Sequence, residues 1–98
     1  RCLRYRGLTL DPDAVEVHLD GRVLEQLTAR EFELLRELLS SPGRVFTREI
    51  LLAKLWGYDF FGDERVVDSH IKNLRNKLGV DYIETVRGVG YRVPKEHP

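Results

Sequence analysis

The side chains best suited to bind another molecule lie in one stretch of the sequence, residues 64–78, ERVVDSHIKNLRNKL. At roughly 100° per residue, apolar residues at steps of four, three and four form one narrow stripe along an α-helix. The spacing therefore predicts a helix that packs this stripe on a core and presents its other face outward. The stripe consists of Val67, Ile71, Leu74 and Leu78.

The opposite face of this predicted helix combines cations with amide and hydroxyl groups. No acid follows Asp68 before the helix ends at Gly79, whereas a helix built only for solubility usually mixes acids and bases at i, i+4 spacing. We interpret the face as a recognition surface for a DNA major groove; the alternative is a solvated basic face without a ligand. The face comprises Arg65, Ser69, Lys72, Asn73 and Asn76, with His70 and Lys77 on one flank and Arg75 on the other.

The distribution of charge favours a polyanionic partner more than the net charge does. Sixteen basic residues balance sixteen acidic ones, although a DNA-binding domain is often strongly basic. Residues 1–64 carry nine bases and twelve acids, a balance of −3, whereas residues 65–98 carry seven bases and four acids, a balance of +3. A neutral chain with this segregation can still present a phosphate-binding face.

The remaining chemistry-bearing residues do not predict an enzyme, a metal site or a cofactor. The cysteine and the histidines are scattered, and the Gly88/Gly90 pair has no following helix of the kind that a phosphate-binding turn requires. No metal role is expected for His18, because no cysteine or second histidine shares its segment. The scattered residues are Cys2, His18, His70 and His97.

Length and composition indicate one domain over residues 1–98. The sequence is 42% hydrophobic and 33% charged, as in soluble globular domains, and no apolar run approaches the ~18 residues of a membrane span. We expect a soluble, cytoplasmic domain without membrane contact, and the lone Cys2 fits a reducing compartment. Because no methionine is present, even at position 1, we expect the chain to be part of a longer protein.

The elements that would position the basic helix follow from local patterns. Short alternating runs separated by turn signals predict a sheet of three or four antiparallel strands over residues 3–27. Thr28 and Glu31 have the spacing of a capping box and predict a helix that ends at residues 40–43, SSPG. A second helix is predicted from the N-cap Thr47 to Gly57, with Trp56 mostly in the core.

Two connections carry candidate contact residues. The loop at residues 57–63, GYDFFGD, contains Tyr58, Asp59, Phe60 and Phe61; two adjacent phenylalanines cannot both face the core, so at least one should be exposed. Such exposure suggests a protein contact, with packing over the helix ends as the alternative. Residues 82–86 and 91–93 are predicted to form a hairpin around RGVG, a wing whose Arg87 can enter a minor groove. The alternative is a hairpin whose arginine is only solvated.

Six sequence blocks in register resemble one family, from about Leu3 to Val93. In order, these blocks are LT with EF and LL (residues 27–35), RE with LL (48–52), WG (56–57), VD with HI (67–71), LR with KL (74–78), and TVRG with GYR (85–92). Together they are similar to the winged-helix effector domain of OmpR/PhoB-type response regulators.

The resemblance implies an α+β fold, with an N-terminal antiparallel sheet, three helices and a C-terminal hairpin wing. It also implies that the domain binds double-stranded promoter DNA as the output domain of a two-component regulator, and that it binds direct repeats as a dimer. The partners implied are an upstream receiver domain absent from this chain, a sensor kinase acting through that receiver, and RNA polymerase.

The same resemblance implies roles for individual residues. Asn73 and Ser69 match positions that face base edges, Arg87 matches the wing residue in the minor groove, and Trp56 lies near the DNA backbone. Residues 57–63 match a segment that contacts RNA polymerase in some members. The helix positions matched to phosphates or bases are Arg65, His70, Lys72 and Arg75, and the predicted DNA-binding set also includes Asn76, Lys77 and Thr85.

Two positions depart from the family pattern, which often has arginine in place of Asn73 and an aliphatic residue in place of Ser69. Asparagine prefers adenine, whereas arginine reads guanine, so we expect adenine opposite Asn73.

One competing function remains at this point: a winged helix that contacts proteins, anchored by Phe60 and Phe61.

Overall fold

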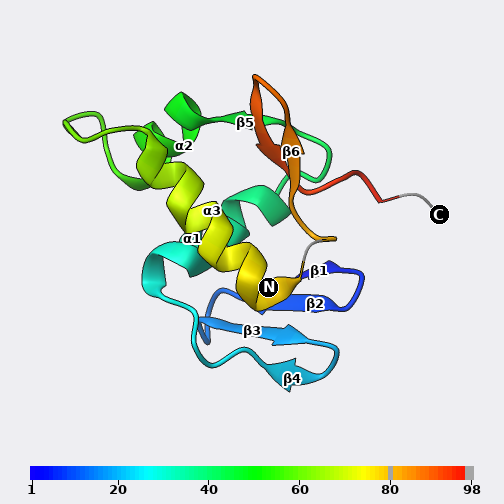
Figure 1. Ribbon diagram of the computed structural model, residues 1–98. Helices are drawn as coiled ribbons and strands as arrows, with labels where there is room; N and C mark the ends of the chain where they lie inside the picture. Colours follow the sequence, from blue (N-terminus) through cyan, green and yellow to red (C-terminus); the bar gives the residue numbers. More distant parts are fainter. Residues whose placement is uncertain (80, 97–98) are drawn as a thin grey trace.

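The computed structural model describes residues 1–79 and 81–96, so His97 lies outside the described residues. Two small antiparallel sheets flank a group of three helices (Figure 1). The first four strands are β1 (Leu3–Tyr5), β2 (Leu8–Asp11), β3 (Glu16–Leu19) and β4 (Arg22–Val23). The helices are α1 (Ala29–Leu39), α2 (Arg48–Leu55) and α3 (Arg65–Leu78), and the remaining strands are β5 (Phe46–Thr47), β6 (Glu84–Val86) and β7 (Gly90–Arg92).

The N-terminal sheet is a four-stranded meander in the order β1-β2-β3-β4, as the alternating pattern predicted. Its register pairs Leu10 with both Leu3 and Val17, and Leu8 with both Tyr5 and Leu19. Leu8 and Leu10 are completely buried, so the inward-facing side chains of the sheet form the floor of the hydrophobic core. This floor supports α1 and the C-terminal half of α3 (Figure 1).

The predicted starts of the first two helices are confirmed. The Thr28 side chain accepts the Glu31 amide at 3.1 Å, and Glu31 Oε1 accepts the Thr28 amide at 3.0 Å, which completes the capping box. The Thr47 side chain likewise accepts the Ile50 amide at 3.1 Å. Both helices begin where their caps satisfy amides that have no partner within the helix.

The third helix also follows its predicted pattern. Arg65–Leu78 is helical, and Gly79 with a φ of +103° ends it. All four stripe residues are at most 4% exposed and join the core formed by α1 and the N-terminal sheet: Val67, Ile71, Leu74 and Leu78. No helix among the described residues is both long and apolar enough to cross a lipid bilayer.

The second sheet, in the order β5-β7-β6, contains a strand that sequence patterns did not predict. β5 has only two residues and pairs Phe46 with Tyr91 and Thr47 with Gly90. Gly90 was predicted to lie in the turn of the hairpin, but it belongs to β7. A Cβ atom at Gly90 would lie 2.1 Å from the Phe46 carbonyl oxygen, so glycine is required there by the close approach of β5.

The hairpin itself is slightly shorter than predicted, with its strands at Glu84–Val86 and Gly90–Arg92 instead of 82–86 and 91–93. Three residues form its tip, closed by the Val89 amide donating to the Val86 carbonyl at 2.9 Å. Gly88 has a φ of +76° and provides the left-handed conformation that this tight turn requires. Arg87 is therefore held at the tip of a short and closed hairpin.

Candidate nucleic-acid interface

The outward face of α3 presents its polar side chains to solvent. Among the described residues, no hydrogen bond or ion pair engages the side chains of Lys72, Asn73 or Asn76. Burial of the apolar stripe forces this orientation, because residues on the opposite side of one helix cannot also face the core. The exposed residues of the face are Arg65, Ser69, Lys72, Asn73 and Asn76.

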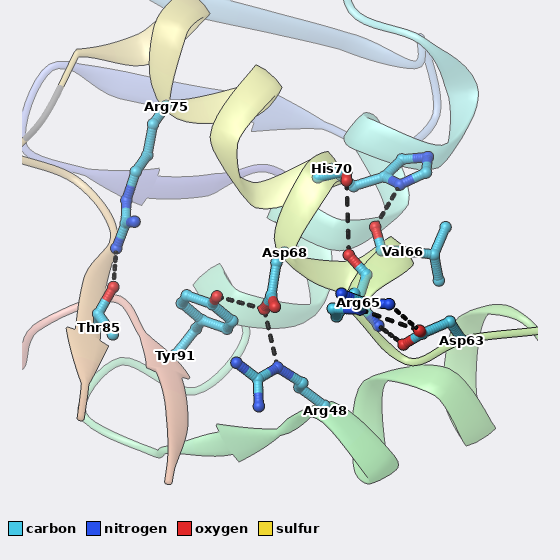
Figure 2. Close-up of polar contacts among 10 residues, drawn as sticks. Arg48, Asp63, Arg65, Val66, Asp68, His70, Arg75, Thr85 and Tyr91 are labelled. Atoms are coloured by element: carbon cyan, nitrogen blue, oxygen red, sulfur yellow. Dashed lines mark hydrogen bonds and ion pairs between the residues drawn. The ribbon is translucent and has the colours of Figure 1, made fainter. Parts of the chain in front are cut away.

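Arg65, at the start of α3, is paired with the acid that precedes the helix. Its Nε and Nη2 atoms donate to Asp63 Oδ2 at 2.9 and 2.7 Å, and its amide donates to Asp63 Oδ1 at 2.9 Å (Figure 2). The hydrogen bonds from Arg65 lower the pKa of Asp63. The Arg65 side chain nevertheless remains 82% exposed, so a phosphate can compete with Asp63 for it.

His70 lies on the flank of α3, half-buried against the other helices. Its Nδ1 atom is 2.8 Å from the Val66 carbonyl oxygen and therefore carries the proton as the donor (Figure 2). Its ring contacts Trp56 edge-on at a centroid distance of 5.1 Å, and the Arg30 guanidinium covers the indole at 4.7 Å. The predicted DNA contact of His70 remains a prediction, but one of its nitrogens has a partner within the helix.

Asp68 connects three elements, and the sequence patterns did not reveal this role. Its Oδ1 atom accepts from Arg48 Nε at 2.8 Å and from the Tyr91 hydroxyl at 2.5 Å, joining α3 to α2 and β7 (Figure 2). Burial raises the pKa of Asp68, but the hydrogen bonds from Arg48 and Tyr91 outweigh burial and lower it. The only sequence signal was an isolated acid at the start of an otherwise basic helix.

Arg75 and Thr85, both predicted to contact DNA, contact each other. Arg75 Nη2 donates to Thr85 Oγ1 at 2.6 Å, and its Nε and Nη2 atoms share the Ile83 carbonyl oxygen at 3.1 and 2.9 Å. Figure 2 shows the arginine reaching from α3 to the hairpin. The Arg75 cation is therefore engaged within the domain, and its predicted phosphate contact stays a prediction.

Lys77 is also engaged within the protein. Its Nζ atom lies 2.6 Å from Glu31 Oε1 and 2.6 Å from the Gln26 carbonyl oxygen. Glu31 is only 2% exposed and was recognised from the sequence only as a capping residue. Burial raises the pKa of Glu31, but the hydrogen bonds from Lys77 and from the Thr28 amide outweigh burial and lower it. The structure thus gives Lys77 a partner in the core, and its predicted phosphate contact stays a prediction.

The hairpin tip and the loop before α3 provide the other predicted contact residues. Arg87 and Thr85 are exposed. In the loop, Tyr58 and Phe61 are 95% and 97% exposed, which confirms that at least one of the adjacent phenylalanines faces solvent. Phe60 instead packs near Trp56, with ring centroids 6.4 Å apart, and attaches the loop to the rest of the domain.

Comparison with known proteins identifies similar chains. A family model described as "Transcriptional regulatory protein, C terminal" matches residues 22–93. Regulatory protein VanRB of Enterococcus faecalis is 52% identical over 90 residues, covering 92% of this chain and 40% of that protein. Transcriptional regulatory protein CseB of Streptomyces coelicolor is 47% identical over 91 residues, covering 93% of this chain and 38% of that protein. The chain thus spans about 40% of the length of these relatives.

Solved structures share the fold over almost the whole chain. The Klebsiella pneumoniae RstA DNA-binding domain, solved in complex with the RstA box, superposes with a TM-score of 0.86 at 33% identity, covering 96% of this chain and 97% of that one. The response regulator DrrB, described as a Thermotoga maritima OmpR/PhoB homologue, gives a TM-score of 0.85 at 35% identity, covering 95% of this chain and 44% of that one.

The pairing of Lys77 with Glu31 predicts a pH-dependent loss of stability on substitution. Breaking a fully buried ion pair costs about 3 to 5 kcal/mol. Because the Lys77 side chain is 29% exposed, Lys77→Met should lower the free energy of unfolding by less, about 2 to 3 kcal/mol at neutral pH. Because the folded-state pKa of Glu31 is lowered, this contribution is complete above the ordinary value of 4.5 and is lost as pH falls through the folded-state value.

Urea unfolding of the native protein and the variant at a series of pH values measures this effect. The difference in unfolding free energy should shrink as pH falls below 4.5. Lys72→Met is the matched control, because this exposed residue lies on the same helix and should change stability by less than about 0.5 kcal/mol. Equal effects of the two substitutions would contradict a structural role for Lys77.

Proposed function

The chain belongs to the family of C-terminal domains of transcriptional regulatory proteins, and from this membership we propose that it binds double-stranded promoter DNA in a sequence-specific manner. The resemblance to OmpR/PhoB-type response regulators is confirmed, and the fold is a winged helix. The domain is not an enzyme. We assign it the role of the output domain of a two-component regulator.

The observation that carries this proposal is the outward face of α3 beside the hairpin. An α-helix fits a B-DNA major groove, which is roughly 12 Å wide, and the exposed Lys72 and Asn73 project from the side of α3 opposite its buried stripe. The wing tip carries the exposed Arg87, which has the length and charge to enter an adjacent minor groove. The two elements together form a bipartite surface for a duplex.

The residues of this surface divide by chemistry. We propose that Lys72, Arg65 and Arg87 contact phosphates or the minor groove and set the register of the domain on the duplex. Asn73, with its amide donor and acceptor, reads an adenine edge, and Ser69 and Asn76 lie beside it on the exposed face. Lys77 is excluded from this set because its ammonium group is bound to Glu31 and to Gln26.

The partners of the whole protein are also proposals. The chain spans about 40% of its relatives, one of which is named as a heme response regulator, HssR of Staphylococcus aureus. We infer an upstream receiver domain controlled by a sensor kinase, in the cytoplasm where promoter DNA is found. Binding as a head-to-tail dimer to direct repeats about 10 to 10.5 bp apart would place both recognition helices on one side of the duplex.

The loop between α2 and α3 is proposed as the RNA polymerase contact. Tyr58, Asp59 and Phe61 are exposed, whereas Phe60 packs against Trp56 and supports the loop. Exposed aromatic side chains on a supported loop are suited to anchor a protein interface. The loop precedes α3 and projects from the opposite end of that helix to the N-terminal sheet (Figure 1).

The competing function is a winged helix that binds only proteins, through the same loop. The neutral net charge favours this function, and the cation-bearing face of α3 opposes it. A mobility-shift assay with mixed genomic fragments at low salt separates the two, because a protein-only module leaves every fragment unshifted. The family of DNA-binding relatives supports the DNA function.

The base preference of Asn73 is tested by selecting bound sites from a random DNA pool. The native domain should select adenine opposite Asn73, and Asn73→Arg should shift that position to guanine, since each good pair discriminates by roughly 1 to 3 kcal/mol. The same sites also give the repeat spacing and orientation. Identical base preferences for the native and Asn73→Arg domains would remove this assignment.

The phosphate role of Lys72 is tested by the salt dependence of binding. Each phosphate contact contributes about −0.9 to the slope of the logarithm of the binding constant against the logarithm of the salt concentration. Lys72→Ala should therefore reduce the steepness of the slope by about one and weaken binding to all DNA sequences alike. Arg36→Ala, an exposed position near the end of α1, is the control and should leave the slope unchanged. A change in sequence preference with an unaltered slope would show that Lys72 reads bases instead.

The loop proposal predicts separable effects on DNA and on polymerase. In the full-length regulator, Phe61→Ala should leave promoter affinity unchanged, because the side chain is 97% exposed and away from the core. It should weaken polymerase recruitment about tenfold, the range of an aromatic anchor residue. Transcription assays with promoter-bound regulator measure recruitment; full activation by a variant carrying both Phe61→Ala and Tyr58→Ala would count against this surface.

A further inference from the structure

Each strand of the wing is attached to α3 by its own polar contact. Arg75 of α3 donates to the Thr85 hydroxyl on β6, and Asp68 of α3 accepts the hydroxyl of Tyr91 on β7 (Figure 2). The two contacts lie two helical turns apart on α3, which restricts rotation of the hairpin as well as its separation from the helix.

The Arg75 contact uses much of the donor capacity of the guanidinium group. Nε and Nη2 both donate to the Ile83 carbonyl oxygen, at 3.1 and 2.9 Å, and Nη2 also donates to Thr85 Oγ1 at 2.6 Å. The guanidinium carbon lies 5.6 Å from the centroid of the Tyr91 ring on β7. The planar fork of arginine suits such a two-pronged contact, whereas the single ammonium of lysine does not.

Arg75 contacts the chain where it leaves the core and enters β6, so this contact determines the direction of that strand. The Ile83 side chain is 2% exposed and packs in the core, so Arg75 fixes the backbone at the point where it leaves the core. Thr85 lies within β6, and Arg87 is the first residue after this strand ends at Val86. The direction of β6 therefore sets the direction in which Arg87 leaves the domain.

We propose that Arg75 is a positioning residue, which holds the wing at a fixed separation from α3 so that the helix and Arg87 engage adjacent grooves as one rigid unit. The proposal rests on the proposed DNA-binding function. Asp68 and Tyr91 provide the second attachment, and Arg48 keeps the carboxylate in place from α2. In this arrangement Arg75 contributes to affinity through Arg87 and not as an independent phosphate ligand.

A double-mutant cycle separates these two roles. The affinity for a selected site and its salt slope are measured for the native domain, Arg75→Met, Arg87→Ala and the variant with both changes. Arg75→Met should weaken binding about 3- to 10-fold, a typical coupling range for interacting residues, but less than about 2-fold when Arg87 is already alanine. In that background it should leave the salt slope unchanged.

An independent phosphate contact gives the opposite result. Arg75→Met would then weaken binding equally in both backgrounds and would reduce the steepness of the slope by about 0.9 in the Arg87→Ala domain. That outcome overturns the proposal. Thr85→Val is a useful companion, because it removes one acceptor of Arg75 with little change of shape and no change of charge. A loss of affinity that disappears in the Arg75→Met background supports the positioning role, whereas a loss that persists there shows that Thr85 acts on DNA by itself.

Amide hydrogen exchange tests the attachment without DNA. The Val89 amide donates across the wing tip to the Val86 carbonyl, and its exchange should accelerate in Arg75→Met relative to amides of α1. Unchanged exchange would overturn the proposal whatever the DNA result. If Arg87→Ala binds DNA as tightly as the native domain, the wing contact of the proposed function fails, and the exchange rates alone then decide whether Arg75 holds the hairpin.

Discussion

Burial of the apolar stripe of α3 determines the rest of this structure. Each fully buried aliphatic side chain contributes about 1.5 to 3 kcal/mol, and the four stripe residues are nearly inaccessible to solvent. No alternative rotation of α3 buries the same residues, so the helix presents one defined face outward. The exposure of Lys72 and Asn73 is therefore a consequence of packing on the opposite side of the helix, and the N-terminal sheet and α1 serve mainly as the surface on which α3 packs.

Polar contacts refine the placement that this packing provides. Asp68, Arg75 and Lys77 connect α3 to α2, to the wing and to the start of α1. Each of these contacts engages a charged side chain that composition alone assigns to the surface. A neutral domain can therefore carry a cationic face while several of its charges are used to position its elements. The face available to a ligand is smaller and better defined than the count of basic residues on the helix suggests.

The sequence predicted the features that depend on neighbours along the chain. Helical periodicity located the stripe of α3, and the Thr28–Glu31 spacing identified the start of α1. Contacts between distant residues were not accessible in this way: Lys77 and Glu31 are 46 positions apart, and no local pattern pairs them. β5 was missed because two residues cannot display an alternating pattern, and Gly90 was placed in the turn because the need for glycine there comes from its contact with that strand.

Trp56 is the only tryptophan in the chain, and its surroundings have a practical consequence. Its indole ring touches a guanidinium from α1, a phenylalanine from the exposed loop and an imidazole from α3. Indole emission responds to the polarity and the quenching groups around the ring. The domain thus contains a built-in optical reporter at the junction of its loop and its recognition helix, and a single fluorescence signal can follow events at both places without an attached dye.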